Sequence, residues 1–195
     1  MELEVINFIQ IGTSNAHDHC YRFVKDQDIE FGVLVEPMSE MMTLAHECYG
    51  SLLHEKNIST ETIAIVPEDR KADKVTIWYH WPNTAFNSIF KGHTNSFNQP
   101  DPVKSFEVDA MTINELFEKY SVTTLDYLFV DTEGLDGEIL MSIDTDKYTI
   151  KEIMFEHRWL GQGKYEMNIL QEKFEPLGYK FSRGETGLDT RIKLT

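Results

Sequence analysis

The sequence predicts an α/β fold whose sheet is mostly parallel and carries helices on both faces. Short apolar runs of strand length alternate with segments whose apolar residues recur at helical spacing, the pattern of repeated strand–helix units. Several of these runs end in Gly, Asp or Glu, which suits the edge of an open sheet that binds a ligand. No repeat, low-complexity tract or Gly/Ser linker interrupts the chain, so we expect one domain over residues 1–195.

The first part of the chain is expected to contain three strands and two helices. Pro37 prevents the second strand from continuing, and Ser39 is suited to cap the helix that follows. We expect the strands at Val5–Ile11, residues 31–35 and residues 62–66, and the helices at residues 17–25 and 40–56.

The remainder begins with a different pattern. Residues 74–81 alternate as an antiparallel strand does, and the polar stretch over about residues 82–103 is long enough to predict a functional loop. Thr112 and Glu115 form a capping box that opens a helix. We expect strands at residues 104–110, 125–130, 149–157, 179–182 and 189–195, and helices at residues 112–120, 134–142 and 165–177, the last followed by Gly178.

Composition restricts the classes of partner and compartment. A net charge of −15 disfavours nucleic acids and anionic lipids. The sequence shows no apolar run of the ~18 residues that a membrane span needs, and the N-terminus reads as a strand rather than a signal peptide. Cys20 and Cys48 form no C-x-x-C pair, which favours a reducing cytosol. We therefore expect a cytoplasmic protein, whose oligomeric state the sequence does not indicate.

The residues after the first strand predict the binding of a small ligand. Gly12 allows close approach of the backbone, and Thr13, Ser14 and Asn15 add hydroxyl, amide and N–H groups before a helix. An ordinary strand-to-helix turn is the alternative. The dinucleotide fingerprint G-x-G-x-x-G is absent, because Ser14 and His17 replace its later glycines, and this disfavours a nicotinamide-dependent oxidoreductase.

Glu36, at the end of the second strand, is placed to accept hydrogen bonds from both hydroxyls of a ribose. Asp131 and Glu133 follow the most apolar strand, in "LFVDTEG". A ligand with a ribose, no phosphate and a cationic centre fits these features together, because carboxylates attract a nearby cation. S-adenosylmethionine has all three properties.

These residues resemble the FkbM-type family of S-adenosylmethionine-dependent methyltransferases. "DTEGLDGEIL" follows the family pattern D-x-E-G-x-E-x-x-x-L with Asp136 in place of the second Glu, and "GVLVEP" is similar to its E-P motif, which includes Glu36 and Pro37. "IQIGTSNAHD" stands where the family has its glycine loop, with Ala16 at the second glycine, and "EIMFEHR" resembles its closing strand. The resemblance covers roughly residues 5–160.

The resemblance implies a Rossmann-like class I methyltransferase sheet of seven strands with the last one antiparallel. It also implies O-methylation of a sugar, a polyketide or a similar small molecule. If residues 62–66 take the role of the family's third strand, Ala64 lies beside the adenine of the cofactor. Asn87–Ile89 correspond to a Ser-Leu pair of the family, so Ser88 is assigned to the acceptor side.

The candidate catalytic residues are Asp131, Glu133 and His157. We expect Asp131 near the cofactor amine and methyl group, with Glu133 facing the acceptor hydroxyl as its base. Glu133 is alternatively a cap of the following helix. His157, after Glu156, is a further base or part of a Mg²⁺ site with the two carboxylates, but no close ligand spacing supports a metal and none is assigned.

The acceptor is expected to contact His80, Trp81 and His93 beside the long polar stretch, where aromatic rings suit stacking on a sugar. A hairpin with a solvated rim explains these residues equally well. Two further alternatives remain for the whole chain: an inactive module of the same fold that binds the cofactor or a partner, and the disfavoured oxidoreductase.

Overall fold

The computed structural model describes residues 5–80, 87–92, 103–158, 167–184 and 188–195. In this part of the chain seven strands form one sheet, in the order β3-β2-β1-β7-β8-β10-β9. Their bounds are β1 Val5–Ile11, β2 Asp28–Val35, β3 Ile58–Glu61, β7 Thr124–Val130, β8 Thr149–Glu156, β9 Tyr179–Arg183 and β10 Asp189–Leu194. β10 is antiparallel to both of its neighbours and the other pairs are parallel. The predicted mostly parallel sheet of seven strands is confirmed, with its last strand antiparallel.

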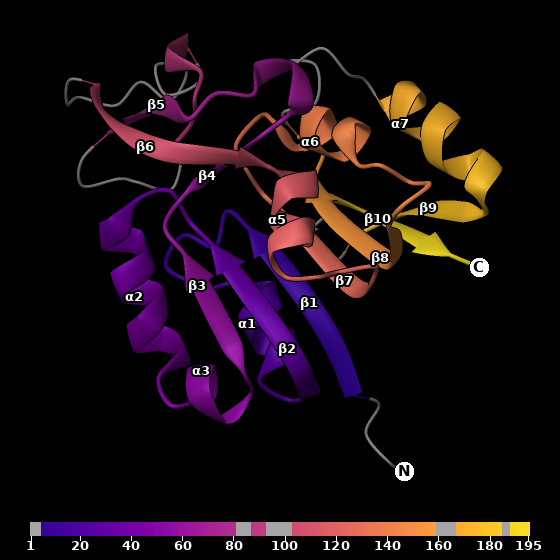
Figure 1. Ribbon diagram of the computed structural model, residues 1–195, viewed down its shortest axis with the longest axis horizontal. Helices are drawn as coiled ribbons and strands as arrows, with labels where there is room; N and C mark the ends of the chain where they lie inside the picture. Colours follow the sequence, from indigo (N-terminus) through magenta and orange to yellow (C-terminus); the bar gives the residue numbers. More distant parts are fainter. Residues whose placement is uncertain (1–4, 81–86, 93–102, 159–166, 185–187) are drawn as a thin grey trace.

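Helices cover both faces of this sheet (Figure 1). One face packs against α5 Ile113–Lys119, α6 Asp136–Ser142 and α7 Met167–Phe174, and the other against α1 His19–Val24, α2 Ser39–Tyr49 and α3 Leu52–Glu55. Strand alternation divides the apolar residues between two cores. In β7, Leu128 faces the α5 side and Phe129 faces the α1 side, and both are buried. Such burial contributes about 1.5–3 kcal/mol for each large side chain.

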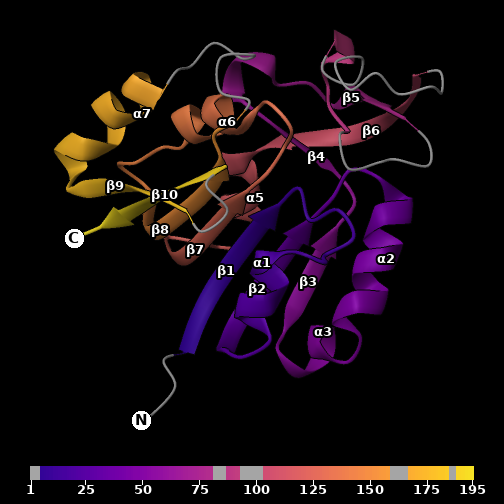
Figure 2. The ribbon, with the colours of Figure 1, turned by 180° about the vertical axis from the view of Figure 1, so that it is seen from behind.

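A second sheet of three strands, in the order β4-β6-β5, lies beyond the ends at which β1 and β2 finish, as both views show (Figures 1 and 2). Its strands are β4 Ala64–Val66, β5 Lys74–Tyr79 and β6 Lys104–Thr112, and β5 pairs antiparallel with β6. β6 runs directly into α5, where Thr112 and Glu115 form the predicted capping box. The two sheets thus meet where the parallel strands end.

The third strand of the main sheet was predicted at the wrong residues. Residues 58–61 form β3, whereas Ala64–Val66 is β4 of the second sheet. The apolar run "IAIV" favoured the later position. β3, with the sequence "ISTE", lies at the edge of the main sheet. An edge strand is buried less completely than the strands inside the sheet, so it needs fewer apolar residues.

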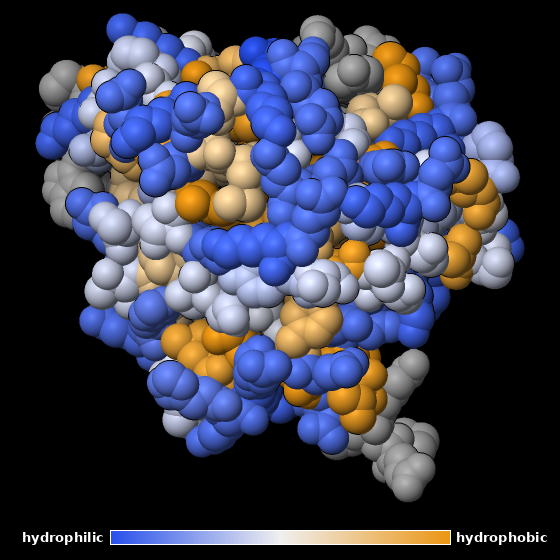
Figure 3. Space-filling view, viewed as in Figure 1, coloured by the Kyte–Doolittle hydropathy of each residue, from blue (hydrophilic) through white to orange (hydrophobic). Residues whose placement is uncertain are grey.

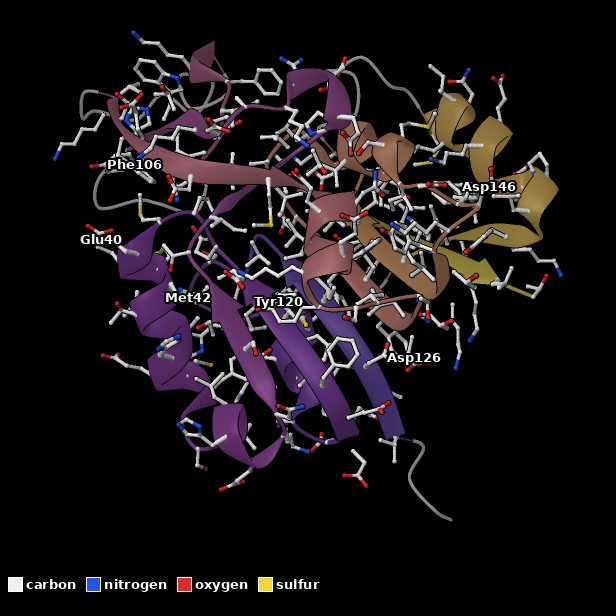
Figure 4. The ribbon with its side chains drawn as sticks, in the orientation of Figure 1. Glu40, Met42, Phe106, Tyr120, Asp126 and Asp146 are labelled. Atoms are coloured by element: carbon white, nitrogen blue, oxygen red, sulfur yellow. The ribbon has the colours of Figure 1, made fainter. Side chains whose placement is uncertain are left out.

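The expected helix over residues 40–56 is interrupted. Gly50, at a φ of 53°, ends α2, and α3 begins after it. Met38 rather than Ser39 occupies the N-cap position of α2, and no side chain caps this end. The amphipathic character is nevertheless as predicted: Figure 4 shows Glu40 on the outer side of α2 and Met42, which is buried, on the side next to the sheet.

Two polar contacts join segments that are distant in sequence. The hydroxyl of Tyr120, labelled in Figure 4, donates to Glu61 at the end of β3 at 2.5 Å. Arg70, in the short 3₁₀ helix Glu68–Arg70 after β4, forms a two-point ion pair with Glu138 of α6, at 2.7 and 3.2 Å. This pair connects the end of the second sheet to the helix that follows β7.

A second 3₁₀ turn, Glu175–Leu177, extends α7 and ends at Gly178, whose backbone is in the left-handed region.

On the face in Figure 3, hydrophilic side chains cover most of the surface and the apolar ones form separate small patches. In the described part of the chain, none of the helices has the length and apolar character needed to cross a membrane.

Candidate functional site

A pocket lies at the carboxyl ends of β1, β2 and β7, where the second sheet closes over them. Several predicted site residues line it together: Gly12, Ser14, Glu36, Pro37, Ala64, Ser88, Asp131 and Glu133. They come from segments as far apart in sequence as residues 12 and 133. The carboxyl edge of a parallel sheet gathers such residues because adjacent strands all end there.

Gly12 is required by the packing of β1 against β7. Its φ is +82°, and a Cβ at this position would lie 1.7 Å from the carbonyl oxygen of Asp131. The Asp131 N–H in turn donates to the Ile11 carbonyl at 2.9 Å. The absence of a side chain therefore allows the ends of the two strands to touch, and this places Asp131 beside the loop that follows β1.

The loop after β1 is closed by its own hydrogen bonds. The N–H groups of Gly12 and Thr13 both donate to the Val35 carbonyl, at 2.9 and 3.0 Å, and the Ser14 N–H donates to Glu36 Oε2 at 2.8 Å. The N–H groups of residues 12–14, which the sequence offers to a small ligand, are therefore bonded within the protein in this arrangement. Ser14 and Ala16 adopt positive φ values of 50° and 61°, which shape the turn in place of further glycines.

Glu36 is the best-defined polar group of the pocket. It is only 4% exposed, and its other oxygen, Oε1, accepts from the Met38 N–H at 2.9 Å. Burial raises the pKa of Glu36 to about 7, although these two N–H donors act in the opposite direction. A carboxylate has about four acceptor positions, so two remain for a ligand with paired hydroxyls. Two free acceptor positions match the two hydroxyl donors of a ribose.

The opposite wall of the pocket is largely apolar. It is formed by Ile63, Ala64, Ile65, Ile77, Ile89 and Leu135. Asn87 lies on the same wall, where its Nδ2 approaches the Met38 sulfur at 3.7 Å. In the described part of the chain its buried Oδ1 has no hydrogen-bond partner. An apolar slot with an unsatisfied acceptor suits a flat ring that carries an N–H donor, as adenine does.

The loop after β7 is held by Asp136 and Ser88. The Asp136 carboxylate accepts from the Thr132 hydroxyl at 3.0 Å and from the N–H groups of Thr132 and Gly134 at 3.3 Å. The Ser88 hydroxyl donates to the Glu133 carbonyl at 2.9 Å. Glu133 itself has a φ of 54°, a conformation that is costly for a residue with a side chain. The alternative that Glu133 caps α6 is wrong, because the cap position is Leu135.

Three carboxylates converge at this edge. Asp131, Glu133 and Glu156 each place an oxygen so that the three oxygens lie within 4.8 Å of one another. Strand register explains the group: Val130 pairs with Phe155, so the next residues, Asp131 and Glu156, are neighbours. Glu156 is the last residue of β8, whereas the sequence had indicated His157.

Crowding of like charges has a clear electrostatic effect. Part of Asp131 is open to solvent in the pocket, yet the protein packed around its carboxylate and the charges of Asp136, Glu156 and Glu133 raise its pKa well above the ordinary value. Burial, together with Glu133, Asp136 and Asp189, raises the pKa of Glu156 to about 8. Burial also raises the pKa of Asp136 to about 7, against its hydrogen bonds from the loop. A bound cation would relieve this repulsion.

The structure does not bring every predicted site residue into the pocket. Thr13 is fully buried, and its hydroxyl has no partner in the described part of the chain, while Asn15 accepts from the His17 N–H at 3.1 Å on the exposed side of the loop. His80 is buried directly after β5 and is not among the residues that line the pocket. His157 Nδ1 lies 3.1 Å from the Thr190 hydroxyl rather than in the carboxylate group. Trp81 and His93 lie outside the described residues.

Sequence reasoning missed three residues of the site. Asn87 and Thr132 line the pocket, and Glu156 belongs to the carboxylate group. No local signal separated Glu156 from His157, because the position of Glu156 beside Asp131 follows from the register of β8 against β7. No sequence signal distinguished Asn87 from the other polar residues of the long stretch before it.

The model of the Methyltransferase FkbM domain matches residues 10–181. No curated protein sequence matches the chain. The Methyltransferase FkbM from Methylobacillus flagellatus KT superposes with a TM-score of 0.54 at 12% identity, covering 98% of this chain and 44% of that one.

Two further solved structures have similar folds. A methyltransferase from Geobacter sulfurreducens gives a TM-score of 0.51 at 10% identity, over 97% of this chain and 71% of that one. The METTL16 MTase domain gives 0.52 at 8% identity, over 100% of this chain and 61% of that one. The chain therefore spans well under two thirds of the FkbM structure and slightly under two thirds of the METTL16 domain. At these identities the comparisons show a shared class I methyltransferase fold.

Proposed function

The chain belongs to the FkbM methyltransferase family, and from this premise we propose that it transfers the methyl group of S-adenosylmethionine to a hydroxyl of a sugar, polyketide or similar small molecule. The observation that most supports this proposal is the environment of Glu36. Its carboxylate is buried beside the Gly12 loop, is oriented by the Ser14 and Met38 N–H groups and keeps acceptor positions for two ribose hydroxyls.

The remaining parts of the cofactor are assigned by chemistry. The adenine ring occupies the apolar wall near Ala64 and Ile65, with the Asn87 amide within the same wall. Pro37 and Ser14 border the ribose beside Glu36. The ammonium group and the sulfonium centre lie toward Asp131, because two positive charges are favoured beside a group of carboxylates.

S-adenosylmethionine supplies an electrophilic methyl group on a positively charged sulfur. The protein has to hold an acceptor oxygen ~3–3.5 Å from that methyl carbon, in line with the bond that breaks. A base that takes the hydroxyl proton accelerates such a transfer by about 10²–10⁴-fold. Glu133 is our candidate base, because the Ser88 contact holds its backbone and its carboxylate lies beside that of Asp131.

The acceptor class is proposed from the family and from charge. The net charge of −15 favours a neutral or cationic acceptor over a nucleic acid. His80, Trp81, Ser88 and His93 remain our proposed acceptor-side residues, and His157 a proposed accessory base. A cytoplasmic location is proposed because Cys20 and Cys48 form no C-x-x-C pair, which favours a reducing compartment.

Thermal unfolding with S-adenosylhomocysteine or NAD tests the cofactor assignment. A ligand at 100 times its dissociation constant stabilises the folded state by about 2.7 kcal/mol. We expect a clear rise in Tm with S-adenosylhomocysteine and none with NAD. Stabilisation by NAD alone would reject the proposal. Transfer of an isotope-labelled methyl group to a panel of glycans and small alcohols then separates an active enzyme from a module that only binds the cofactor.

A further inference from the structure

We propose that Asp131, Glu133 and Glu156 bind one oxygen-preferring divalent cation of the Mg²⁺ class, at the junction between the cofactor pocket and a smaller pocket beside it. The catalytic purpose of this ion rests on the methyl transfer proposed above, whereas its binding does not. The ion was not expected from the sequence, whose only candidate ligand set included His157.

The spacing of the three carboxylates fits an ion of this size. Mg²⁺ and Ca²⁺ bind oxygens at about 2.0–2.6 Å, so two ligands of one ion lie at most about 4–5 Å apart. The oxygens of Asp131, Glu133 and Glu156 lie within 4.8 Å of one another. Small side-chain adjustments would therefore bring all three onto one ion, with water or the acceptor hydroxyl in the remaining positions.

Gln10 provides an independent indication that a positive or donating ligand belongs here. It lies on β1, is 4% exposed, and lines the smaller pocket together with Asp131 and Glu156. Its Nε2 donates to Asp18 at 2.6 Å, which fixes the amide so that Oε1 is the free end. In the described part of the chain this buried Oε1 has no hydrogen-bond partner. A buried acceptor without a partner costs about 1–3 kcal/mol, so a ligand is expected beside it.

A cation explains this environment better than a water molecule. Asp131, Glu156, Asp189 and Gln10 all line the smaller pocket, and each carries oxygen acceptors. One water donates only two hydrogen bonds, whereas a divalent cation accepts six or more oxygen ligands and neutralises the carboxylates as well. Glu156 Oε2, another buried acceptor, also lacks a partner among the described residues.

An ion at this position could activate the acceptor hydroxyl. Asp131 lines both the cofactor pocket and the smaller pocket, so an ion on its carboxylate lies at the edge of the site where the methyl group is expected. An alcohol that coordinates such an ion loses its proton more readily and is held in a fixed direction. The oxygen then forms the new bond to carbon as the carbon–sulfur bond breaks. Its proton passes to the Glu133 oxygen that does not bind the ion, and from there to solvent.

Binding of Mn²⁺ to the chain without cofactor tests the proposal, with the free ion followed by electron paramagnetic resonance. We expect one Mn²⁺ per chain, displaced by excess Mg²⁺. Glu156→Gln and Asp131→Asn should each weaken binding at least tenfold, since even indirect support of a metal ligand is worth 10–100-fold. Gln10→Met, which removes the amide oxygen, should weaken it severalfold. Asp109→Asn removes an exposed carboxylate of β6 and should leave binding unchanged.

Mn²⁺ binding that is absent, or that is equal in wild type, Glu156→Gln and Asp131→Asn, would overturn the proposal. S-adenosylhomocysteine binding is measured on the same samples in the presence of a chelator. If the protein binds S-adenosylhomocysteine but does not bind Mn²⁺, the carboxylates are arranged for the ammonium group of the cofactor. The metal proposal alone would then fail, and the proposed function would stand. Metal binding without any S-adenosylhomocysteine binding would support the ion and reject the proposed function.

Discussion

Glu36 should make binding of S-adenosylhomocysteine depend on pH. Its pKa is raised from 4.5 to about 7 because it is buried, so in the empty site it is about half protonated at neutral pH. Ribose hydroxyls donate most strongly to the ionised carboxylate. A group with a pKa of about 7 is roughly one tenth ionised at pH 6 and nine tenths ionised at pH 8. Affinity should therefore rise about tenfold over this range.

The sign of the effect on folding is opposite. Between pH 4.5 and 7 the folded protein holds a proton on Glu36 that the unfolded chain has released, so the free energy of unfolding falls as pH rises through this window. Glu36→Gln cannot titrate and should remove this part of both pH dependences. It should also weaken S-adenosylhomocysteine binding by about 10–100-fold, because charge-assisted hydrogen bonds are worth about 1.5–3 kcal/mol.

Calorimetric titrations of the wild type and of Glu36→Gln at pH 6, 7 and 8, with a chelator present, measure their affinities for S-adenosylhomocysteine. The reasoning is refuted if wild type and Glu36→Gln bind S-adenosylhomocysteine equally, or if their affinities change with pH in the same way. The second result would assign the titration to other carboxylates of the pocket.

Three further substitutions test other parts of the structure. Gly12→Ala should lower the free energy of unfolding by roughly 2–5 kcal/mol, because its methyl group would meet the Asp131 carbonyl at a positive φ. Chemical denaturation measures this change, with Gly92→Ala as the control, since a methyl group there meets no described residue within 4 Å. Equal effects of the two substitutions would contradict the packing. Arg70→Met should cost about 2–3 kcal/mol, because it removes a two-point ion pair from a Glu138 side chain that is 1% exposed, while Arg70 itself is 37% exposed. Adding Glu138→Gln should restore part of that loss, and no recovery would mean that the charge is not the cause. Asp131→Asn should abolish methyl transfer while Tm is retained, and unchanged turnover would remove Asp131 from the mechanism.

The sequence predicted the fold well because its signals are local. Apolar runs and helical spacing place β1, β2, β7 and β8 close to their observed bounds, and the capping box at Thr112 marks the start of α5 correctly. β3 was misplaced because an edge strand needs few apolar residues, and "ISTE" has no strand-like pattern of its own. The break at Gly50 was missed because the apolar spacing continues across it.

The site was predicted less completely, for geometric reasons. Glu36, Gly12 and Asp131 follow strands directly, so their positions come from the sheet itself. Thr13 and Asn15 lie in a loop whose side-chain directions depend on the positive φ values of Ser14 and Ala16, which no pattern of residue types predicted.

The choice between Glu156 and His157 depended on the register of β8 against β7, a long-range property of the folded sheet. The register puts Glu156 beside Asp131, and it directs His157 to Thr190 of β10 instead. Residue types near a strand end were thus sufficient to locate the site but not to select its members.

The central claim is that this pocket holds the cofactor through Glu36. A crystal structure of the protein grown with saturating S-adenosylhomocysteine tests it most directly. The account predicts density between Gly12 and Glu36, with both ribose hydroxyls within hydrogen-bond distance of the Glu36 carboxylate and the adenine against the wall that contains Ala64 and Asn87. Density for the ligand elsewhere, or an empty pocket at saturation, would contradict it.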